Sequence, residues 1–279
     1  MGVQRAQRGA GAVQLRRLTA ARGLRHDRAL RTPDDARWYR LALGALIGSA
    51  WLVVALWGSS PYAGWLGHRE TGADTPSPVF RLAVFVGGWT VMTVAMMLPG
   101  SLPLVNLFRR VVAQRPDRWG LLLRLGAGYL GVWAGFGAAA FAADLVVVHA
   151  LVERLPWFAA LLPPGVLLAA GAFQFTALKE RCLSQCRSPL TFLAGHWRGV
   201  HPGRDAWTLG LHHGLFCVGC CWALMLLMFA VGIAHLGWML ALGAIMAAER
   251  TLPWGDRLTR PVGAALVAWA VLPQAARLL

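Results

Sequence analysis

Residues 211–228 read LHHGLFCVGCCWALMLLM and lie within an apolar run, residues 208–231, that contains no Asp, Glu, Lys or Arg. An α-helix rises about 1.5 Å per residue, so about 20 apolar residues cross the roughly 30 Å hydrocarbon core of a bilayer. The run is continuously apolar, whereas the strands of a membrane β-barrel alternate between apolar and polar residues. This stretch therefore predicts a transmembrane helix.

Six further apolar runs lie on either side of this stretch. Hydrophobic residues make up 57% of the 279-residue chain, which is more than the roughly 45–50% of a soluble domain. We therefore predict an all-α fold: a polytopic transmembrane helix bundle of about seven spans within residues 39–279. A six-span count is the alternative because the sixth run is short. The predicted spans are residues 41–58, 80–98, 121–148, 157–178, 208–231, 236–248 and 262–275.

Arginine and lysine are distributed unevenly between alternate loops, which tests the span count independently. Of the 27 such residues, 23 precede the first span or fall in loops on the same side of the predicted bundle. Because Lys and Arg accumulate in short cytoplasmic loops, the N-terminus is predicted inside the cell and the C-terminus outside. We expect a multi-pass protein of a bacterial inner membrane. The four remaining cationic residues are Arg69, Arg81, Arg154 and Arg277.

Residues 1–38 form a segment rich in Arg and poor in acidic side chains. The segment has no apolar core of about 7–15 residues, so it does not match a cleavable secretory signal. We expect a disordered, basic cytoplasmic tail near anionic lipid headgroups, with an organelle transit peptide as the alternative. The net charge of +15 does not indicate a nucleic-acid partner, because the basic residues are dispersed among apolar runs.

The predicted fifth span carries a stripe of Cys, His and Met side chains. Four of them recur at four-residue intervals, so successive members lie one helical turn apart on a shared face. Thiolate, thioether and imidazole groups select monovalent copper or zinc over hard ions such as magnesium. We predict a metal site, with copper favoured over zinc; the alternative is that Cys and Met simply fill the helix core. The predicted ligands are His212, His213, Cys217, Cys220, Cys221 and Met225.

Two further cysteines follow the predicted fourth span. Cys182 and Cys186 are four residues apart and share one face if the helix continues past the membrane. Their spacing differs from the CxxC pattern of zinc ribbons and thioredoxin-like sites. The neighbouring Lys179, Arg181 and Arg187 favour thiolate over thiol, which suits either metal binding or oxidation to a disulfide.

A methionine cluster lies at the end of the predicted second span. Met92 and Met96 are four residues apart, Met97 follows directly, and Pro99 and Pro103 interrupt the pattern just beyond. Thioether sulfur is a soft ligand for monovalent copper. The alternative is that these adaptable side chains fill gaps in the core.

Two acidic residues lie in or beside apolar runs. Glu249 closes the predicted sixth span, and we place it among the candidate metal ligands. Because Arg250 follows it, an anchor at the membrane interface is the competing interpretation for Glu249. Asp144 lies inside the third span, where an ionised acid costs at least about 2.5 kcal/mol at the bilayer centre, so it is expected to face the bundle interior.

The predicted orientation brings these motifs to one side of the membrane. The second span ends there with the Met cluster, and the fourth ends there with the CxxxC pair. The fifth begins there with its two histidines, and the sixth returns there with Glu249. We therefore predict one thiol- and imidazole-lined site in the cytoplasmic half of the bundle, open or nearly open to the cytoplasm.

These segments resemble a bacterial family of predicted metal-binding integral membrane proteins with no defined function. The resemblance rests on four stretches: WTVMTVAMMLPGSLP (89–103), LKERCLSQCRSP (178–189), GLHHGLFCVGCCWALMLLM (210–228) and ERTLPWG (249–255). It covers residues 80–271, and the CxGCCW element is the most specific part. What the resemblance implies is a multispanning protein whose Cys, His and Met positions bind a metal ion.

Three functions follow from these observations. The first is copper handling by binding, transfer or transport through the Cys, His and Met site. The alternatives are a membrane thiol-disulfide oxidoreductase, in which the CxxxC pair exchanges electrons with the fifth-span thiols, and a structural or assembly subunit. Hydrolytic chemistry is not indicated, since the chain has no HExxH motif, nucleophile elbow or Walker loop. The expected partners are the lipid bilayer, a metal ion, a soluble metal carrier and a second copy of the chain.

Overall fold

The computed structural model describes residues 33–60, 77–147, 154–231 and 236–278. Within these ranges the secondary structure is all-α, with nine α-helices and one short 3₁₀ helix, so the predicted fold class is confirmed. Contacts divide the chain into two units, residues 1–46 and 47–279. Most of the predicted basic tail, residues 1–32, lies outside the described residues.

The helices begin at residues that suit helix starts. Ser77 caps α3 by accepting a hydrogen bond from the Phe80 amide at 3.3 Å, and a proline occupies the first turn of α3, α5 and α7. The elements are α2 (Pro33–Gly58), α3 (Pro78–Val111), α4 (Arg118–Val147), α5 (Pro156–Phe173), α6 (Ala177–Arg187), α7 (Pro189–His196), α8 (Pro202–Val231), α9 (Leu236–Thr251), η3 (Gly255–Leu258) and α10 (Thr259–Leu278).

Every one of the seven predicted spans falls on helical structure, but fewer helices satisfy the length and composition of a membrane crossing. Four do so by themselves: α2 over Arg37–Gly58, α3, α4 and α8. The bent pair α5 and α6 gives a fifth if the two helices together make one span. The chain thus has the helices of a multi-pass membrane protein, with four or five candidate spans in its described part.

The predicted fourth span is not one continuous helix. Helix α5 ends at Phe173, α6 begins at Ala177, and the two are bent by 64°. Thr176 produces the break, because its hydroxyl oxygen accepts from the Lys179 amide at 3.3 Å and so starts a new helix. The same hydroxyl donates to the Phe173 carbonyl at 2.8 Å, which also accepts from the Thr176 amide at 3.0 Å.

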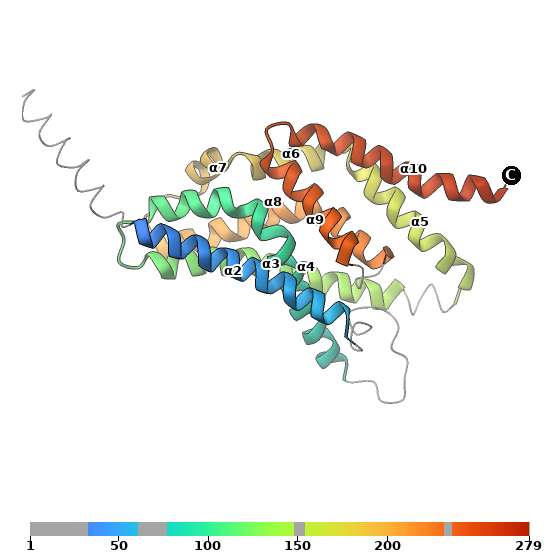
Figure 1. Cartoon of the computed structure of the whole chain (residues 1–279), viewed down its shortest axis with the longest axis horizontal. Helices are drawn as coiled ribbons and strands as arrows, with labels where there is room; N and C mark the ends of the chain where they lie inside the picture. Colours follow the sequence, from blue (N-terminus) through green and yellow to red (C-terminus); the bar gives the residue numbers. More distant parts are fainter. Residues whose placement is uncertain (1–32, 61–76, 148–153, 232–235, 279) are drawn as a thin grey trace, which may run out of the picture. The chain divides into compact units, whose positions relative to one another are not determined.

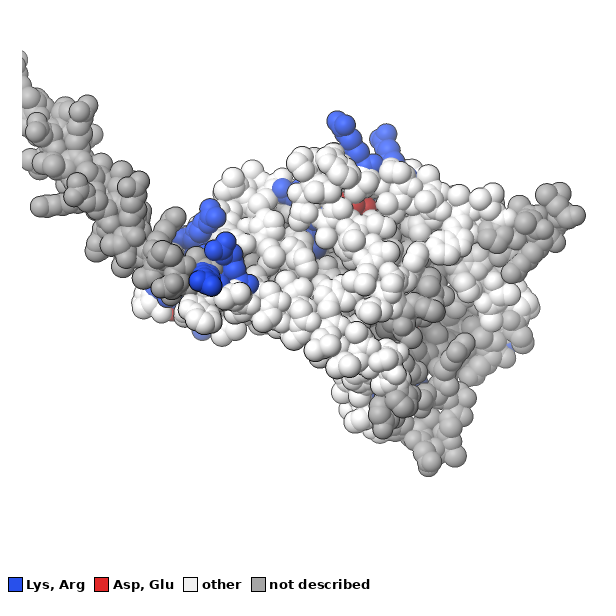
Figure 2. All heavy atoms as spheres, viewed as in Figure 1, with Lys and Arg blue, Asp and Glu red and all other residues white. Residues whose placement is uncertain are grey.

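The distribution of side chains in unit 47–279 is the reverse of that in a soluble protein. Large apolar residues such as Leu123 and Val146 are 74% and 65% exposed, whereas Lys179 and Glu249 are 1% and 0% exposed. On the face in Figure 2 most of the described surface is uncharged, and Lys and Arg are confined to a few groups. This arrangement fits a lipid environment, in which charged groups lie inside the protein and apolar groups face the acyl chains.

Helix α8 forms the centre of unit 47–279 and packs closely along α4 (Figure 1). A side chain at Gly128 of α4 would place its Cβ 2.5 Å from the carbonyl oxygen of Trp207 on α8. The two backbones therefore approach as closely as helices do in membranes when glycine lies between them. This contact fixes α8 against α4 just before the stretch that carries its cysteines.

Besides α4, the helices α5, α6, α7 and α9 contact α8. Helix α6 packs against α8, α9 packs against α3, and α9 also contacts both α6 and α8. Helix α10 lies along α5 (Figure 1). The Met segment of α3, the CxxxC segment of α6, the thiols of α8 and the end of α9 are therefore neighbours in space.

Candidate metal centre

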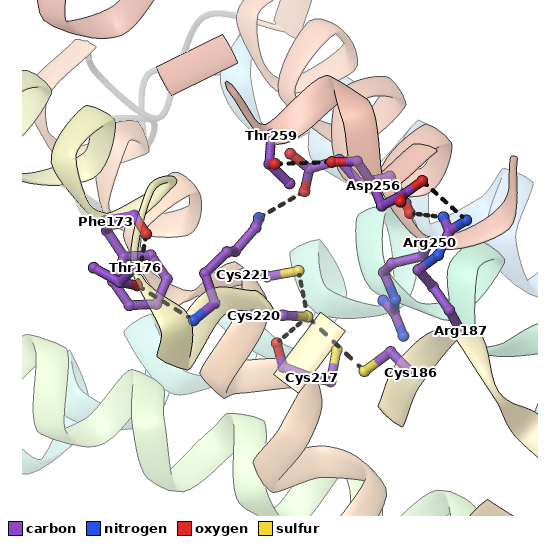
Figure 3. Close-up of polar contacts among 12 residues, drawn as sticks. Phe173, Thr176, Cys186, Arg187, Cys217, Cys220, Cys221, Arg250, Asp256 and Thr259 are labelled. Atoms are coloured by element: carbon purple, nitrogen blue, oxygen red, sulfur yellow. Dashed lines mark hydrogen bonds and ion pairs between the residues drawn. The ribbon is translucent and has the colours of Figure 1, made fainter. Parts of the chain in front are cut away.

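Four thiols from two helices form a buried cluster, which we call the thiol cluster: Cys186 of α6 and Cys217, Cys220 and Cys221 of α8. The Sγ atom of Cys220 lies 3.3 Å from that of Cys221 and 3.9 Å from that of Cys186. Cys220 also donates to the Cys217 carbonyl at 3.3 Å. All five cysteines of the chain are free thiols and all are buried. Figure 3 shows the four members together, with dashed lines joining Cys186, Cys220 and Cys221.

The fifth cysteine, Cys182, lies on α6 against Gly219 of α8. A Cβ at Gly219 would lie 2.6 Å from the Cys182 sulfur, so the absence of a side chain there lets α6 approach α8. Cys182 makes no sulfur contact with another cysteine among the described residues. Its position supports the packing of the two helices that carry the thiol cluster.

Aromatic and imidazole rings cover one side of the cluster. The Tyr129 hydroxyl on α4 lies 3.2 Å from the Cys217 sulfur, and its ring stacks on His213 with centroids 5.4 Å apart. His213 Nε2 lies 3.2 Å from the Ser101 hydroxyl of α3. The other ring nitrogen, Nδ1, is buried and has no hydrogen-bond partner among the described residues. His213 therefore retains one unused polar atom inside the bundle.

Arg250 of α9 reaches into the same interior and is only 4% exposed. Its guanidinium donates to Ser101 Oγ at 3.0 Å and to the Met97 carbonyl at 3.3 Å, and it lies 3.9 Å from the Met97 sulfur. The group fits there because a Cβ at Gly100 would already lie 3.1 Å from it.

A buried ion pair joins α6 to α9 beside the cluster. Lys179 Nζ lies 2.6 Å from Glu249 Oε2, and both side chains are almost fully buried. Arg187 strengthens this junction by donating to the Glu249 carbonyl and, at 2.9 Å, to the Pro253 carbonyl. It also pairs with Asp256 at 3.5 Å (Figure 3). These contacts hold the end of α9 on the helix that carries Cys186.

The fixed charges of this interior do not cancel. Lys179 and Glu249 neutralise each other, but Arg250 forms no ion pair with any described residue. A buried charge without a counterion destabilises the folded protein by several kcal/mol. Removal of one partner from a buried ion pair lowers stability by a similar amount. A negatively charged group placed nearby would therefore stabilise Arg250.

The structure brings together only part of the predicted site. Cys186, the three α8 cysteines and His213 lie in one region with Met97 and Glu249, as described above. Met92, Met96 and Met225 are buried in the same core cluster as these thiols, whereas His212 is exposed. No group of three or more His, Cys, Asp or Glu side chains in the described ranges is arranged to hold a metal ion.

Two interpretations made from the sequence are wrong. Glu249 is not an interfacial anchor, because it is fully buried and paired with Lys179. The site is not open to the cytoplasm in this conformation, because every cysteine is at most 7% exposed. Hydropathy cannot separate a charged residue that reaches toward headgroups from one that folds inward onto a partner.

Sequence reasoning missed Tyr129 and Ser101 near the cluster, and it noted Lys179 and Arg250 only as charged neighbours of the CxxxC pair and of Glu249. Lys179 is the single lysine of the chain and Arg250 follows an acid at the end of an apolar run, so both offered a weak signal. Ser101 and Tyr129 offered none, because small hydroxyl and aromatic residues are ordinary in membrane helices.

A family model matches most of the part of the chain that carries these contacts. Residues 86–273 match the family PpoB2, described as a copper chaperone. This range includes all five cysteines, His213 and Arg250, and it closely follows the range of the motif resemblance, residues 80–271. No curated protein and no solved structure matches the chain.

Proposed function

The chain belongs to the PpoB2 copper chaperone family, and from this premise we propose that it carries monovalent copper within the membrane at the thiol cluster. Copper is the cargo that the protein receives and passes on. Cys186 and Cys220 are the principal ligands, and Cys217 and Cys221 are the neighbouring thiols able to exchange with them. The observation that carries the proposal is the close approach of sulfur atoms from α6 and α8 beside a buried cation.

The separation of the sulfur atoms supports this assignment. Two thiolates bound to one ion at about 2.3 Å lie about 3.8 Å apart at a tetrahedral angle and about 4.6 Å apart in a linear arrangement. The sulfur atoms of Cys186 and Cys220 are 3.9 Å apart, so they are within reach of one shared ion. Soft thiolate and thioether ligands select monovalent copper, and the thioether of Met97 lies 3.9 Å from the Arg250 guanidinium within the same interior.

Charge supports the same assignment. Two thiolates and one monovalent copper ion carry a net charge of about −1, and Arg250 supplies a buried positive charge with no carboxylate partner among the described residues. The loaded interior is then electrically neutral. Copper is favoured over zinc because structural zinc takes four ligands in a tetrahedron, and the described residues contain no such group.

We also propose that the protein is a multi-pass protein of the bacterial inner membrane with seven spans, its N-terminus inside and its C-terminus outside. The helical state of all seven apolar runs and the bias of Lys and Arg toward one side support this topology. Helices α9 and α10 then cross in contact with α3 and α5, which compensates for the short apolar stretch of α9. Residues 1–38 form its basic cytoplasmic tail.

The test is copper content in the detergent-purified protein loaded with Cu⁺ under reducing conditions. We expect the Cys186→Ser/Cys220→Ser variant to lose the bound copper that the unaltered protein retains after dialysis against a competing chelator. Cys182→Ser is the matched control, because Cys182 is on the same helix, equally buried and outside the cluster. Retention of full copper by the double variant would refute the proposed ligands.

A thiol-disulfide oxidoreductase is the second candidate, favoured by the same approach of the Cys186 and Cys220 sulfurs. Formation of a disulfide between them would pass two electrons and two protons to a partner's disulfide, which becomes two thiols, through a mixed disulfide. Mass spectrometry of trapped mixed disulfides tests it. Their absence from cells expressing Cys220→Ser, the variant that traps a Cys186-linked intermediate, removes this function.

A further inference from the structure

A pair of histidines lies at the surface, outside the thiol cluster. His196 is the last residue of α7, and its ring lies 4.8 Å from the ring of His212 on α8, with the planes tilted by 49°. His212 is exposed and His196 is half-buried. The sequence placed His212 with the cysteines of α8, but its side chain lies on another face of the helix beside α7.

The hydrogen bonding of His196 leaves one ring nitrogen available to a metal ion. Its Nδ1 atom lies 2.8 Å from the Phe192 carbonyl oxygen. A carbonyl oxygen only accepts, so Nδ1 carries the hydrogen and the neutral ring presents the lone pair of Nε2. Metal-binding histidines are usually held in this way, with the second nitrogen donating to a backbone carbonyl.

The separation of the two rings fits a shared ion. Imidazole nitrogens bind first-row metals at about 2.0–2.1 Å, which places two ring centroids roughly 4.5–5.2 Å apart for ligand angles of about 90–110°. The observed 4.8 Å lies within that range. Stacking between two neutral rings alone would also bring them together, so the pair needs a second observation that points to a ligand.

That observation is a line of rings from the histidine pair to the thiol cluster. The Phe192 ring stacks on His196 with centroids 4.3 Å apart and meets His213 edge-on at 5.6 Å. His213 stacks on Tyr129, whose hydroxyl contacts Cys217. His213 Nδ1 is buried and unpartnered within the described residues, so a second imidazole nitrogen lies free on the way inward.

We propose that His196 and His212 form an uptake site at which a copper ion first binds before it passes by His213 to the thiols. This inference rests on the proposed copper function and adds the path by which the ion reaches the thiol cluster. Imidazole is a borderline ligand and thiolate a soft one, so a monovalent copper ion gains affinity as it moves inward. The exposed pair solves an access problem, since the thiols are closed to solvent.

The experiment measures the rate and the extent of copper loading separately. Detergent-purified apoprotein is mixed with Cu⁺ held by a weak chelator, and thiolate-to-copper absorbance is followed in time. We expect His196→Ala/His212→Ala to reach the final copper content of the unaltered protein, but at least about tenfold more slowly, the scale expected for loss of a metal contact. His201→Ala is the matched control, an exposed histidine of the α7–α8 loop that should leave the rate unchanged.

A second measurement identifies the ligand atoms directly. X-ray absorption of Cu⁺ added to the Cys186→Ser/Cys220→Ser variant should report nitrogen neighbours, and these should disappear when His196→Ala and His212→Ala are added. Loading of the double histidine variant at the normal rate, or equal slowing by His201→Ala, would overturn the uptake site while leaving the thiol site intact. Loss of copper from the unaltered protein would instead reject the underlying copper function.

Discussion

Replacement of Arg250 by methionine removes the one buried cation near the thiols that has no carboxylate partner among the described residues. Methionine is unbranched and fills much of the space of the arginine stem, so the change removes charge with limited loss of packing. The guanidinium donates to Ser101 and to the Met97 carbonyl. Ser101 keeps a partner after the change, because its own hydroxyl lies 3.2 Å from the same carbonyl.

The two states of the protein should respond differently to this substitution. Without copper, Arg250→Met removes a costly buried charge together with two hydrogen bonds, so the free energy of unfolding should change by no more than about 1 kcal/mol. With copper, the anionic thiolate complex loses its counterion. Loss of such an outer contact weakens metal binding by about 10–100-fold, or roughly 1.4–2.7 kcal/mol.

Chemical unfolding in detergent with and without Cu⁺ distinguishes these effects. At a free copper concentration 100 times the unaltered protein's Kd, copper should raise the free energy of unfolding by about 2.7 kcal/mol. A variant that binds 100-fold more weakly should gain only about 0.4 kcal/mol at that concentration. Arg250→Lys, which retains the charge but not the planar fork, should fall between them. A full copper-dependent gain in Arg250→Met would refute the counterion argument.

Three further substitutions test the surroundings of the cluster, each by chemical unfolding of the apoprotein. Lys179→Met should lower the free energy of unfolding by about 3–5 kcal/mol because it leaves Glu249 buried without its partner. Glu249→Leu in the same chain should recover most of the loss. An unchanged free energy of unfolding in Lys179→Met would contradict this prediction. Gly219→Ala should lower the free energy of unfolding by about 1–3 kcal/mol, because the added methyl group would collide with Cys182. If Cys182→Ala in the same chain does not restore stability, this contact is not the cause of the loss. Tyr129→Phe should lower the free energy of unfolding by about 0.5–1.5 kcal/mol, because it removes the hydroxyl contact to the buried thiol of Cys217. An unchanged free energy of unfolding would show that this contact contributes nothing to stability.

Local patterns predicted the helices of this protein well. The apolar runs became helices because a backbone in lipid must satisfy its hydrogen bonds within each segment. The four-residue spacing of His213, Cys217 and Cys221 placed them on one side of α8, where all three are buried. The spacing of Cys182 and Cys186 likewise placed both on the inner face of α6.

Positions that depend on contacts between helices were predicted poorly. His212 is adjacent to His213 in sequence, yet it is exposed beside α7 because successive residues of a helix point about 100° apart. Glu249 lies at the end of an apolar run, where an anchor and an inward-facing ion pair have the same hydropathy. Its partner Lys179 is 70 residues away, and no local pattern joins the two.

The sequence by itself determined that this is an all-α chain with apolar helices and that its soft ligands lie on a few of them. These properties follow from side-chain chemistry and from the period of the helix, which are local. Only the tertiary structure decided that Cys186 meets Cys220, that Arg250 lies near them with no ion pair to a carboxylate in the described part of the chain, and that the cluster is closed. Those properties depend on how far each helix is rotated and how closely glycine lets it approach its neighbour, which contacts distant in the chain determine together.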